Sequence, residues 1–289
     1  MNFTEAVLIS LASLRANRLR SLLTLLGIVI GVMAVIAVIS IISGLNDYVA
    51  GKIFNLGPDV VTITRMSPVI TSLDDIIENQ KRKNLTLDDM DAVQKACSNC
   101  KSVGASTGSR ARVKFGRDFV DTEIDGYTAN VPAILGNELE TGRFLTEYDV
   151  EHARNYCVIG SEIVDNLLPF VDPIGKTITV DDRPFEVVGV GVKQGSVLGR
   201  SRDNWVMIPI SVHQKMYGAR RSVTIQVKAL DELHLLAVQS EIRLTLRARR
   251  HLAYNTKDDF ALNTNDNFLQ IWANISRAFF AVTIGIASI

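Results

Sequence analysis

One stretch of the chain, from Leu22 to Ile42, is uncharged and almost entirely apolar, with Thr24 and Ser40 as its only polar side chains. As an α-helix its roughly 21 residues would be about 31 Å long, which matches the ~30 Å hydrocarbon core of a bilayer. A buried core helix and a secretory signal peptide share this composition, but the apolar part of a signal peptide is only about 7–15 residues long and ends at a small-residue cleavage site. No such site follows Ile42. The stretch predicts a retained transmembrane helix over residues 22–44.

Basic side chains flank this stretch on one side only. Arg15, Arg18 and Arg20 precede it, whereas Asp47 and a single Lys52 follow it. Because short loops rich in Arg and Lys stay in the cytoplasm, we expect a cytoplasmic N-terminus, with the three arginines positioning the helix in the membrane.

Residues 1–21 have a helical apolar pattern of their own. Phe3, Val7, Leu11 and Leu14 recur at helical spacing, and the arginines follow them. This pattern predicts an amphipathic helix on the cytoplasmic surface of the membrane. An irregular cytoplasmic tail is the alternative.

The C-terminal end is also apolar. Residues 278–289 read AFFAVTIGIASI and follow Arg277. About 12 apolar residues are too few to cross a bilayer. We therefore expect residues 271–289 to be the start of a second transmembrane helix that is cut off partway, and the sequence to be the front part of a longer, multi-pass protein.

The charge balance of the chain is neutral, with 31 Lys and Arg against 31 Asp and Glu. A nucleic-acid-binding protein normally has a basic excess, so we expect no nucleic-acid partner. The mean hydropathy of +0.18 arises from the two apolar ends. The region between them is expected to be a water-soluble domain outside the membrane, large enough for one big core or two small ones.

This middle region has the pattern of an α+β fold built from two β-α-β units. Thr86, followed by two aspartates, predicts a helix N-terminus, and residues 230–252 form a long helical pattern with one apolar stripe. A Gly-rich section with shorter strands lies between the units and indicates an inserted subdomain. The expected parts are 45–117 and 219–270 for the two halves and 118–218 for the insert. Strands are expected at 60–64, 110–115, 119–124, 156–159, 177–180, 184–192, 205–208, 222–228 and 259–264.

Segments along the whole chain resemble the MacB-like permeases of the MacB/FtsX group of ABC transporters. They are NRLRSLLTLLGIVIGVMAVIAVIS (17–40), TGRFLTEYDVEHAR (141–154), VIGSEIVDNLLP (158–169), DPIGKTI (172–178) and PFEVVGV (184–190). The resemblance implies four transmembrane helices in the bacterial inner membrane, with a large periplasmic domain between the first two. In such proteins this domain is a porter-like part interrupted by a Sabre subdomain, which agrees with the insertion expected above.

The resemblance also implies a function. The chain would be a non-catalytic permease subunit, surrounded by membrane lipid and acting as a homodimer or with a related permease. ATP and Mg would bind to a separate ABC ATPase subunit, and this chain would bind no cofactor. ATP hydrolysis would reshape the periplasmic domains (mechanotransmission) and drive efflux through a periplasmic adaptor and an outer-membrane channel. The sequence departs from the family in having no nucleotide-binding domain before Met1, no last three helices, and a Cys97–Cys100 pair outside the family pattern.

Three motifs suggest enzymatic chemistry that their context does not favour. Gly175-Lys176-Thr177 lacks the first glycine of a phosphate-binding loop, since Phe170 stands there. Residues 104–108 match G-x-S-x-G, but no helix follows, so we expect a plain turn. The arginines of 243–250 could suggest phosphate binding, but a solvated helix face is the simpler interpretation. The four histidines have no metal-site spacing, so we expect no catalytic or metal-binding residues.

Two pairs of residues have candidate structural roles. Gly27 and Gly31 form G-x-x-x-G, which allows close packing between membrane helices, although glycine is common in such helices anyway. Cys97 and Cys100 could form a local disulfide in the periplasm, with unpaired thiols and half of a metal site as the alternatives.

The sequence alone leaves other functions open. A transmembrane receptor with a periplasmic sensor domain would share the same topology, and a lipoprotein-extracting or peptide-sensing permease would share the family. No cluster in the sequence identifies a transported substrate.

Overall fold

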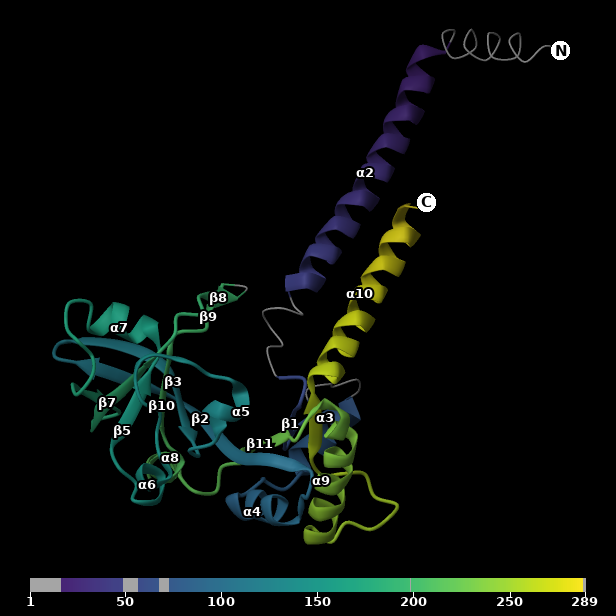
Figure 1. Ribbon diagram of the computed structural model, residues 1–289. Helices are drawn as coiled ribbons and strands as arrows, with labels where there is room; N and C mark the ends of the chain where they lie inside the picture. Colours follow the sequence, from purple (N-terminus) through teal and green to yellow (C-terminus); the bar gives the residue numbers. More distant parts are fainter. Residues whose placement is uncertain (1–16, 49–56, 68–72, 198, 288–289) are drawn as a thin grey trace. The chain divides into compact units, whose positions relative to one another are not determined.

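The computed structural model describes residues 17–48, 57–67, 73–197 and 199–287. The chain forms two compact units (Figure 1). One consists of Met1–Phe54 with Leu269–Ile289, and the other of Asn55–Phe268. The helix predicted over residues 1–21 falls mostly outside the described residues and stays a prediction.

The first unit contains one long apolar helix, α2 (Arg18–Tyr48). It has no proline and no charged residue between Arg20 and Asp47, so nothing interrupts the helical hydrogen bonds over the predicted span. The helix α10 (Asn265–Ala287) starts in the second unit and continues into the first. Within the described residues, only α2 is long and apolar enough to cross a membrane. The second transmembrane helix stays a prediction.

The second unit is built on a sheet of ten strands among the described residues, in the order β12-β1-β11-β2-β3-β10-β5-β7-β4, with β6 pairing to β2 and β7. The strands of this sheet are β1 (Val60–Thr64), β2 (Cys100–Phe115), β3 (Asp118–Tyr127), β4 (Leu139–Gly142), β5 (Tyr156–Ile159), β6 (Thr177–Val180), β7 (Arg183–Gly191), β10 (Trp205–Pro209), β11 (Thr224–Ala229) and β12 (Ala261–Thr264). A separate hairpin consists of β8 (Ser196–Val197) and β9 (Arg200–Ser201). The helices of this unit are α3 (Leu73–Lys81), α4 (Leu87–Ala96), α5 (Val131–Leu135), α6 (Glu147–Glu151), α7 (Ser161–Leu167), α8 (Ile210–Tyr217), the 3-10 turn η2 (Glu232–His234) and α9 (Leu235–Arg249).

One hydrophobic core lies where α4 and α9 cover β1, β11 and the first part of β2. The stripe predicted on the long helix faces this core, with Val238, Ile242 and Leu246 fully buried. Thr86 caps α4 as predicted, because its side chain accepts from the Asp89 N–H while the Asp89 carboxylate accepts from the Thr86 N–H. The helix α9 begins at Leu235, after the 3-10 turn, and not at residue 230 as expected.

A second core lies between the other strands and α7. Phe185, Ile163 and Ile178 are fully buried in it, together with Val113 from the second part of β2. A smaller cluster around Met207 lies apart from it. Because β2 contributes to both main cores, one strand physically joins the two parts of the unit. The subdomain limits at 118 and 218 stay predictions.

The hairpin predicted at residues 110–124 is confirmed, with Gly116 in its turn at φ +62°. The turn expected at residues 104–108 is wrong, because these residues lie inside β2, which starts at Cys100. Two glycines suggested a chain reversal, but tertiary contacts explain both. An added Cβ on Gly104 would meet Val131 and Thr128, and one on Gly108 would meet Asp125.

Candidate functional sites

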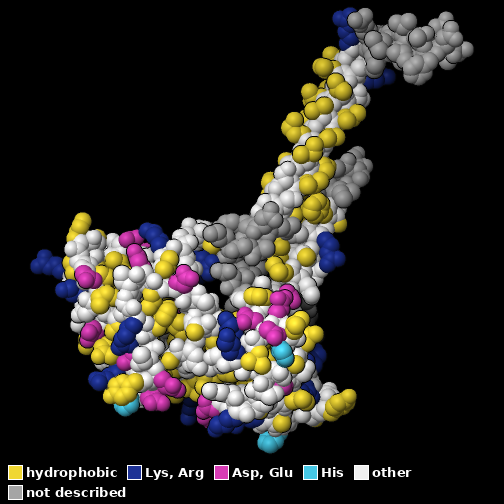
Figure 2. Space-filling view, viewed as in Figure 1, with side chains coloured by type: hydrophobic (Ala, Val, Ile, Leu, Met, Phe, Trp, Pro, Cys, Tyr) yellow, Lys and Arg dark blue, Asp and Glu magenta, His cyan; other side chains and the backbone are white. Residues whose placement is uncertain are grey.

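The apolar helix α2 is the first candidate functional element. Within its 27-residue stretch Arg18–Gly44, an 18-residue window has a mean hydropathy of 3.1, and only 6% of that window is buried. Apolar side chains are visible along its length in Figure 2, with basic ones at its N-terminal end. A helix of about 40 Å that exposes apolar side chains almost all round fits a lipid environment and does not fit a protein core.

The residues of this segment that were singled out from the sequence lie at different positions relative to α2. Arg15 lies outside the described residues, and Arg18 and Arg20 lie in the first turn of α2. Gly27 and Gly31 lie within the span, and no atom of the described chain lies within 4 Å of a Cβ added to either. That Gly27 and Gly31 pack against another membrane helix, of this chain or of a second copy, stays a prediction.

The cysteine pair predicted from the sequence forms a disulfide in the structure. Cys97 and Cys100 have their Cα atoms 5.5 Å apart, and they join the end of α4 to the start of β2. The third cysteine, Cys157, is free and fully buried, and burial raises the pKa of its thiol well above the usual value.

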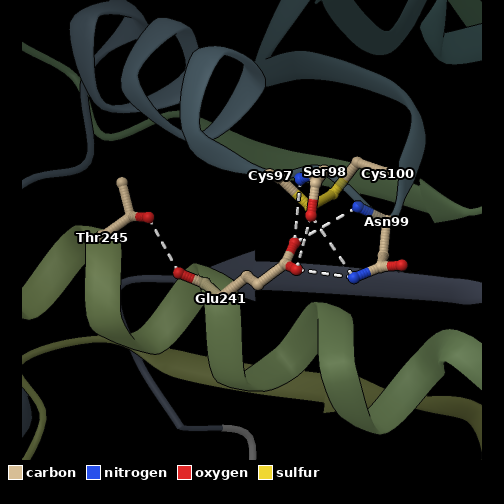
Figure 3. Close-up of a disulfide and its surroundings, with 6 residues drawn as sticks. All are labelled: Cys97, Ser98, Asn99, Cys100, Glu241 and Thr245. Carbon is tan, nitrogen blue, oxygen red and sulfur yellow. Dashed lines mark hydrogen bonds between the residues drawn. A yellow bond between two sulfur atoms is a disulfide. The ribbon is translucent and has the colours of Figure 1, made fainter.

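The loop closed by this disulfide holds the carboxylate of Glu241 from α9 (Figure 3). The carboxylate accepts from the backbone N–H of Ser98 at 3.0 Å and of Asn99 at 3.3 Å. It also accepts from the Ser98 hydroxyl at 2.9 Å and the Asn99 amide at 2.6 Å. Burial raises the pKa of Glu241, but these hydrogen bonds outweigh it and keep the pKa below its usual value. The disulfide loop thus fixes α9 against the connection between α4 and β2.

The arginines at the end of α9 are ion-paired within the fold. Arg250 is 6% exposed and lies 2.9 Å from both Asp89 and Asp259. Burial alone would raise the pKa of Asp89. Hydrogen bonds from Arg250 and the Thr86 backbone outweigh this effect, so the pKa lies below its usual value. Arg249 also pairs with Asp89, while Arg243 and Arg247 pair with Asp258. These side chains stabilise the fold and are not a free phosphate site.

The sequence motifs that suggest enzymatic chemistry lie in strands and turns of the fold. Ser106 lies in β2, and its hydroxyl accepts from the Gln226 amide at 2.7 Å. Thr177 begins strand β6, so the Gly175-Lys176-Thr177 segment does not precede a helix N-terminus. No group of three or more His, Cys, Asp or Glu side chains in the described part of the chain could hold a metal ion.

Two titratable groups with large pKa shifts, the fully buried His213 and the partly buried Asp125, were not singled out from the sequence. His213 lies on α8 and is fully buried against β3. Neither of its ring nitrogens has a hydrogen-bond partner among the described residues. Burial, and then the charge of Arg221, lower its pKa to about 4. Asp125 on β3 has the opposite shift, since burial and the nearby Glu123 raise its pKa to about 7. No local sequence pattern distinguishes either residue.

The fold matches solved structures of ABC transporter domains. The periplasmic region of MacB from Actinobacillus actinomycetemcomitans aligns over 78% of this chain and 97% of its own length, with a TM-score of 0.63 and 22% identity. The extracellular domain of the ABC-type transporter YknZ from Gram-positive bacteria covers 71% of this chain and all of its own, with a TM-score of 0.56 and 16% identity. At these identities the likeness shows the fold alone.

Sequence comparison agrees with the structural match. The pyoverdine export ATP-binding/permease protein PvdT of Pseudomonas fluorescens is 29% identical over 71% of this chain and 31% of its own length. The macrolide export ATP-binding/permease protein MacB of Neisseria gonorrhoeae is 28% identical over 66% of this chain and 29% of its own. The chain therefore spans about a third of these curated relatives.

The model of the MacB-like periplasmic core domain matches residues 21–244, which is most of the chain. This match begins within the apolar helix α2 and extends into α9. The chain, with its MacB-type periplasmic fold following an N-terminal apolar helix, therefore belongs to the MacB-like family of ABC transporter permeases.

Proposed function

We propose that this chain is the permease component of a MacB-type efflux transporter in a bacterial inner membrane, driven by ATP hydrolysis in a separate ABC ATPase subunit that binds the ATP and Mg. The observation that carries the proposal is the MacB-type periplasmic core joined within one chain to the long apolar helix α2. The named relatives are exporters that include ATP-binding parts.

The strand connections support transmission of motion from the membrane into the periplasmic domain. β1 follows α2 in the chain, and β12 continues into α10 without a loop. These two strands are hydrogen-bonded neighbours, with Val61 opposite Thr264. A displacement of either helix would pull on adjacent strands of one continuous sheet, whose hydrogen bonds reach through β2 and β3 to the other core. In this mechanism the residues have mechanical roles, and the chemistry takes place in the partner.

The proposed assembly contains two copies of the permease or this chain with a related permease, each with further transmembrane helices. A periplasmic adaptor and an outer-membrane channel would carry the substrate outward. The relatives' names supply two probes, a macrolide and a pyoverdine-type siderophore, but the proposal concerns efflux and not one cargo.

The test uses the complete permease and its ATPase in a bacterial strain that lacks its own macrolide and siderophore exporters. We expect export of at least one probe to require both proteins. A variant in which a short linker replaces residues 57–264 should still reach the membrane and bind the ATPase, but should lose export. The surface variant Arg117→Glu serves as the matched control and should export normally. Export that persists after removal of the periplasmic domain would refute the proposed mechanism.

A further inference from the structure

A groove of about 520 Å³ lies on the second unit between its two main cores. Its lining comes from the end of β1, from β2, from the end of α8 and from the segment that leads into β11. Most of its lining is hydroxyl or guanidinium, with Tyr217 as its one aromatic ring. The lining residues used below are Arg65, Asn84, Thr107, Tyr217, Arg220 and Arg221.

Asn84 holds together cationic segments that are far apart in the sequence. Its side-chain oxygen accepts from Arg65 at 2.8 Å, and its amide donates to the backbone carbonyl of Arg220 at 2.6 Å. Arg82 donates to the backbone carbonyl of Arg65 at 3.1 Å. Lys81 and Lys83 flank Arg82 in the sequence. We call the set of Arg65, Lys81, Arg82, Lys83, Arg220 and Arg221 the basic cluster.

No member of the basic cluster forms an ion pair among the side chains that the structure describes, although a carboxylate lies at the groove, where Asp181 accepts from the Tyr217 hydroxyl at 2.9 Å. The recorded contacts of Arg221 are a hydrogen bond to the Ser109 hydroxyl at 2.8 Å and the ring of Tyr217. The arginines of α9, in contrast, are paired with aspartates. Gathering like charges is unfavourable for folding, and this chain has as many acids as bases. A bound anion would relieve the repulsion between cations gathered in this way.

The shape and chemistry of the groove favour an extended, carboxylate-bearing occupant. Pockets for small ligands enclose most of the ligand and have mainly apolar walls, whereas this groove is open and polar. The cations that line it, Arg65 and the pair Arg220 and Arg221, come from two separate chain segments. The C-terminus of α8, which has a partial negative charge, also faces the groove and disfavours one dense phosphate group. Carboxylates spaced along a polypeptide can each meet a different guanidinium.

We propose that this groove is a docking surface for an acidic segment of a protein partner in the periplasm. The arginines pair with its carboxylates, and the Thr107 and Tyr217 side chains lie beside the bound segment. Such a contact is sensitive to salt, because its charges lie at the surface and are screened. The inference concerns this surface alone and does not depend on the transported substrate.

The test measures binding of a fluorescent peptide of alternating Asp and Glu to the full chain in nanodiscs of uncharged lipid. We expect saturable binding that weakens at least about tenfold between 50 mM and 500 mM salt, and no binding of the matched Asn/Gln peptide. The variant Arg220→Glu/Arg221→Glu should lose binding, and Arg220→Ala/Arg221→Ala should weaken it about tenfold. The control Arg117→Glu/Lys176→Glu makes the same change in net charge at exposed positions outside the groove and should bind like the unaltered protein.

Three outcomes would overturn the proposal. One is the absence of saturable peptide binding at low salt. Another is equal loss of binding in the Arg220/Arg221 and control variants, which would mean only general charge attraction. The third is displacement of the peptide by low concentrations of inorganic phosphate or of a short-chain phosphatidylglycerol, which would assign the groove to small anions or lipid headgroups. Circular dichroism of each variant shows whether it is folded, and the alanine pair tests the groove even if charge reversal disturbs the fold.

Discussion

At the scale of single residues, the structure explains side chains by what surrounds them. His213 has no hydrogen-bond partner among the described residues, although it is fully buried, and it lies so close to β3 that a Cβ on Gly126 would overlap it. Its neutral ring therefore acts as a packing group. Asp125, on the same strand as Gly126, is kept partly protonated near neutral pH because burial raises its pKa.

His213 and Asp125 should give opposite pH dependences of stability. The pKa of His213 falls to about 4 on folding, so between about 6.5 and 4 the unfolded chain binds more protons, and stability declines as the pH falls. We expect His213→Leu to remove this loss, which amounts to about 3 kcal/mol at most. The pKa of Asp125 rises to about 7, so stability declines as the pH rises from about 4 to 7, and Asp125→Asn should remove that decline.

Urea unfolding followed by tryptophan fluorescence at pH 4.5, 5.5, 6.5 and 7.5 measures both effects as differences from the unaltered protein. If the difference in unfolding free energy between His213→Leu and the unaltered protein did not change with pH over this range, the assignment of a neutral buried ring would be wrong.

The three cysteines give a prediction about the number of free thiols. The folded, oxidised chain should present no reactive thiol, because Cys97 and Cys100 are bonded and Cys157 is buried. Denaturation should release one thiol, and denaturation with reductant should release three. Thiol titration measures each number. Three free thiols in denatured protein that was never reduced would show that the disulfide is absent.

At the scale of elements, α9 is attached to its surroundings at both faces and at its end. Its apolar stripe packs in the first core, Glu241 binds the disulfide loop, and Arg250 lies between Asp89 and Asp259. Sequence periodicity predicted the stripe, because it depends on neighbours along one helix. The attachments of Glu241 to Ser98 and of Arg250 to Asp89 were not predicted, because these partners lie 143 and 161 residues away.

Loss of the Glu241 contact should weaken the attachment of α9. We expect Glu241→Gln to lower the free energy of unfolding by about 1–2 kcal/mol at pH 7, because an amide cannot accept from all four donors. The pKa of Glu241 is lowered on folding, so this stabilisation is present above about pH 4.3 and is lost as the pH falls further. Glu232→Gln, at an exposed position on the 3-10 turn, is the control. Equal stability of both variants at pH 7 would contradict the role of Glu241.

Loss of the buried Arg250 should have a larger effect. We expect Arg250→Met to cost about 3 kcal/mol, because it leaves Asp259 without its partner and the buried Asp89 with only the half-exposed Arg249. Arg243→Met should cost at most about 1 kcal/mol, because that pair is half exposed and Arg247 still neutralises Asp258. Urea unfolding of the two variants compares them directly, and similar losses would show that burial does not decide the strength of these pairs.

At the scale of the whole molecule, the two compact units differ in the surface that they expose. The first unit contains the exposed apolar helix α2, and the second contains the sheet and both main cores. Because each core of the second unit is closed by its own strands and helices, this unit has the hydrophobic contacts it needs without the first.

Separating the units should therefore change solubility and leave the fold of the second unit intact. We expect residues 55–268, expressed alone in the periplasm, to be water-soluble and to unfold cooperatively, whereas the full chain should remain in the membrane after an alkaline carbonate wash. Differential centrifugation and circular dichroism measure both properties. If the fragment of residues 55–268 were insoluble or unfolded while the full chain behaved normally, the second unit would depend on the first.

The sequence by itself determined the apolar span, the cap of α4, the hairpin between β2 and β3 and the stripe of α9, because each depends on residues close together along the chain. The same local signals placed a turn at residues 104–108, where tertiary packing against Thr128 and Val131 requires a glycine within a continuous strand. Only the tertiary structure decided that the α9 arginines are paired with aspartates, whereas the basic cluster around Asn84 has no ion pair among the side chains that the structure describes. Charge partners are chosen by distance in space, and a neutral sequence gives no indication of which charges the fold leaves unpaired.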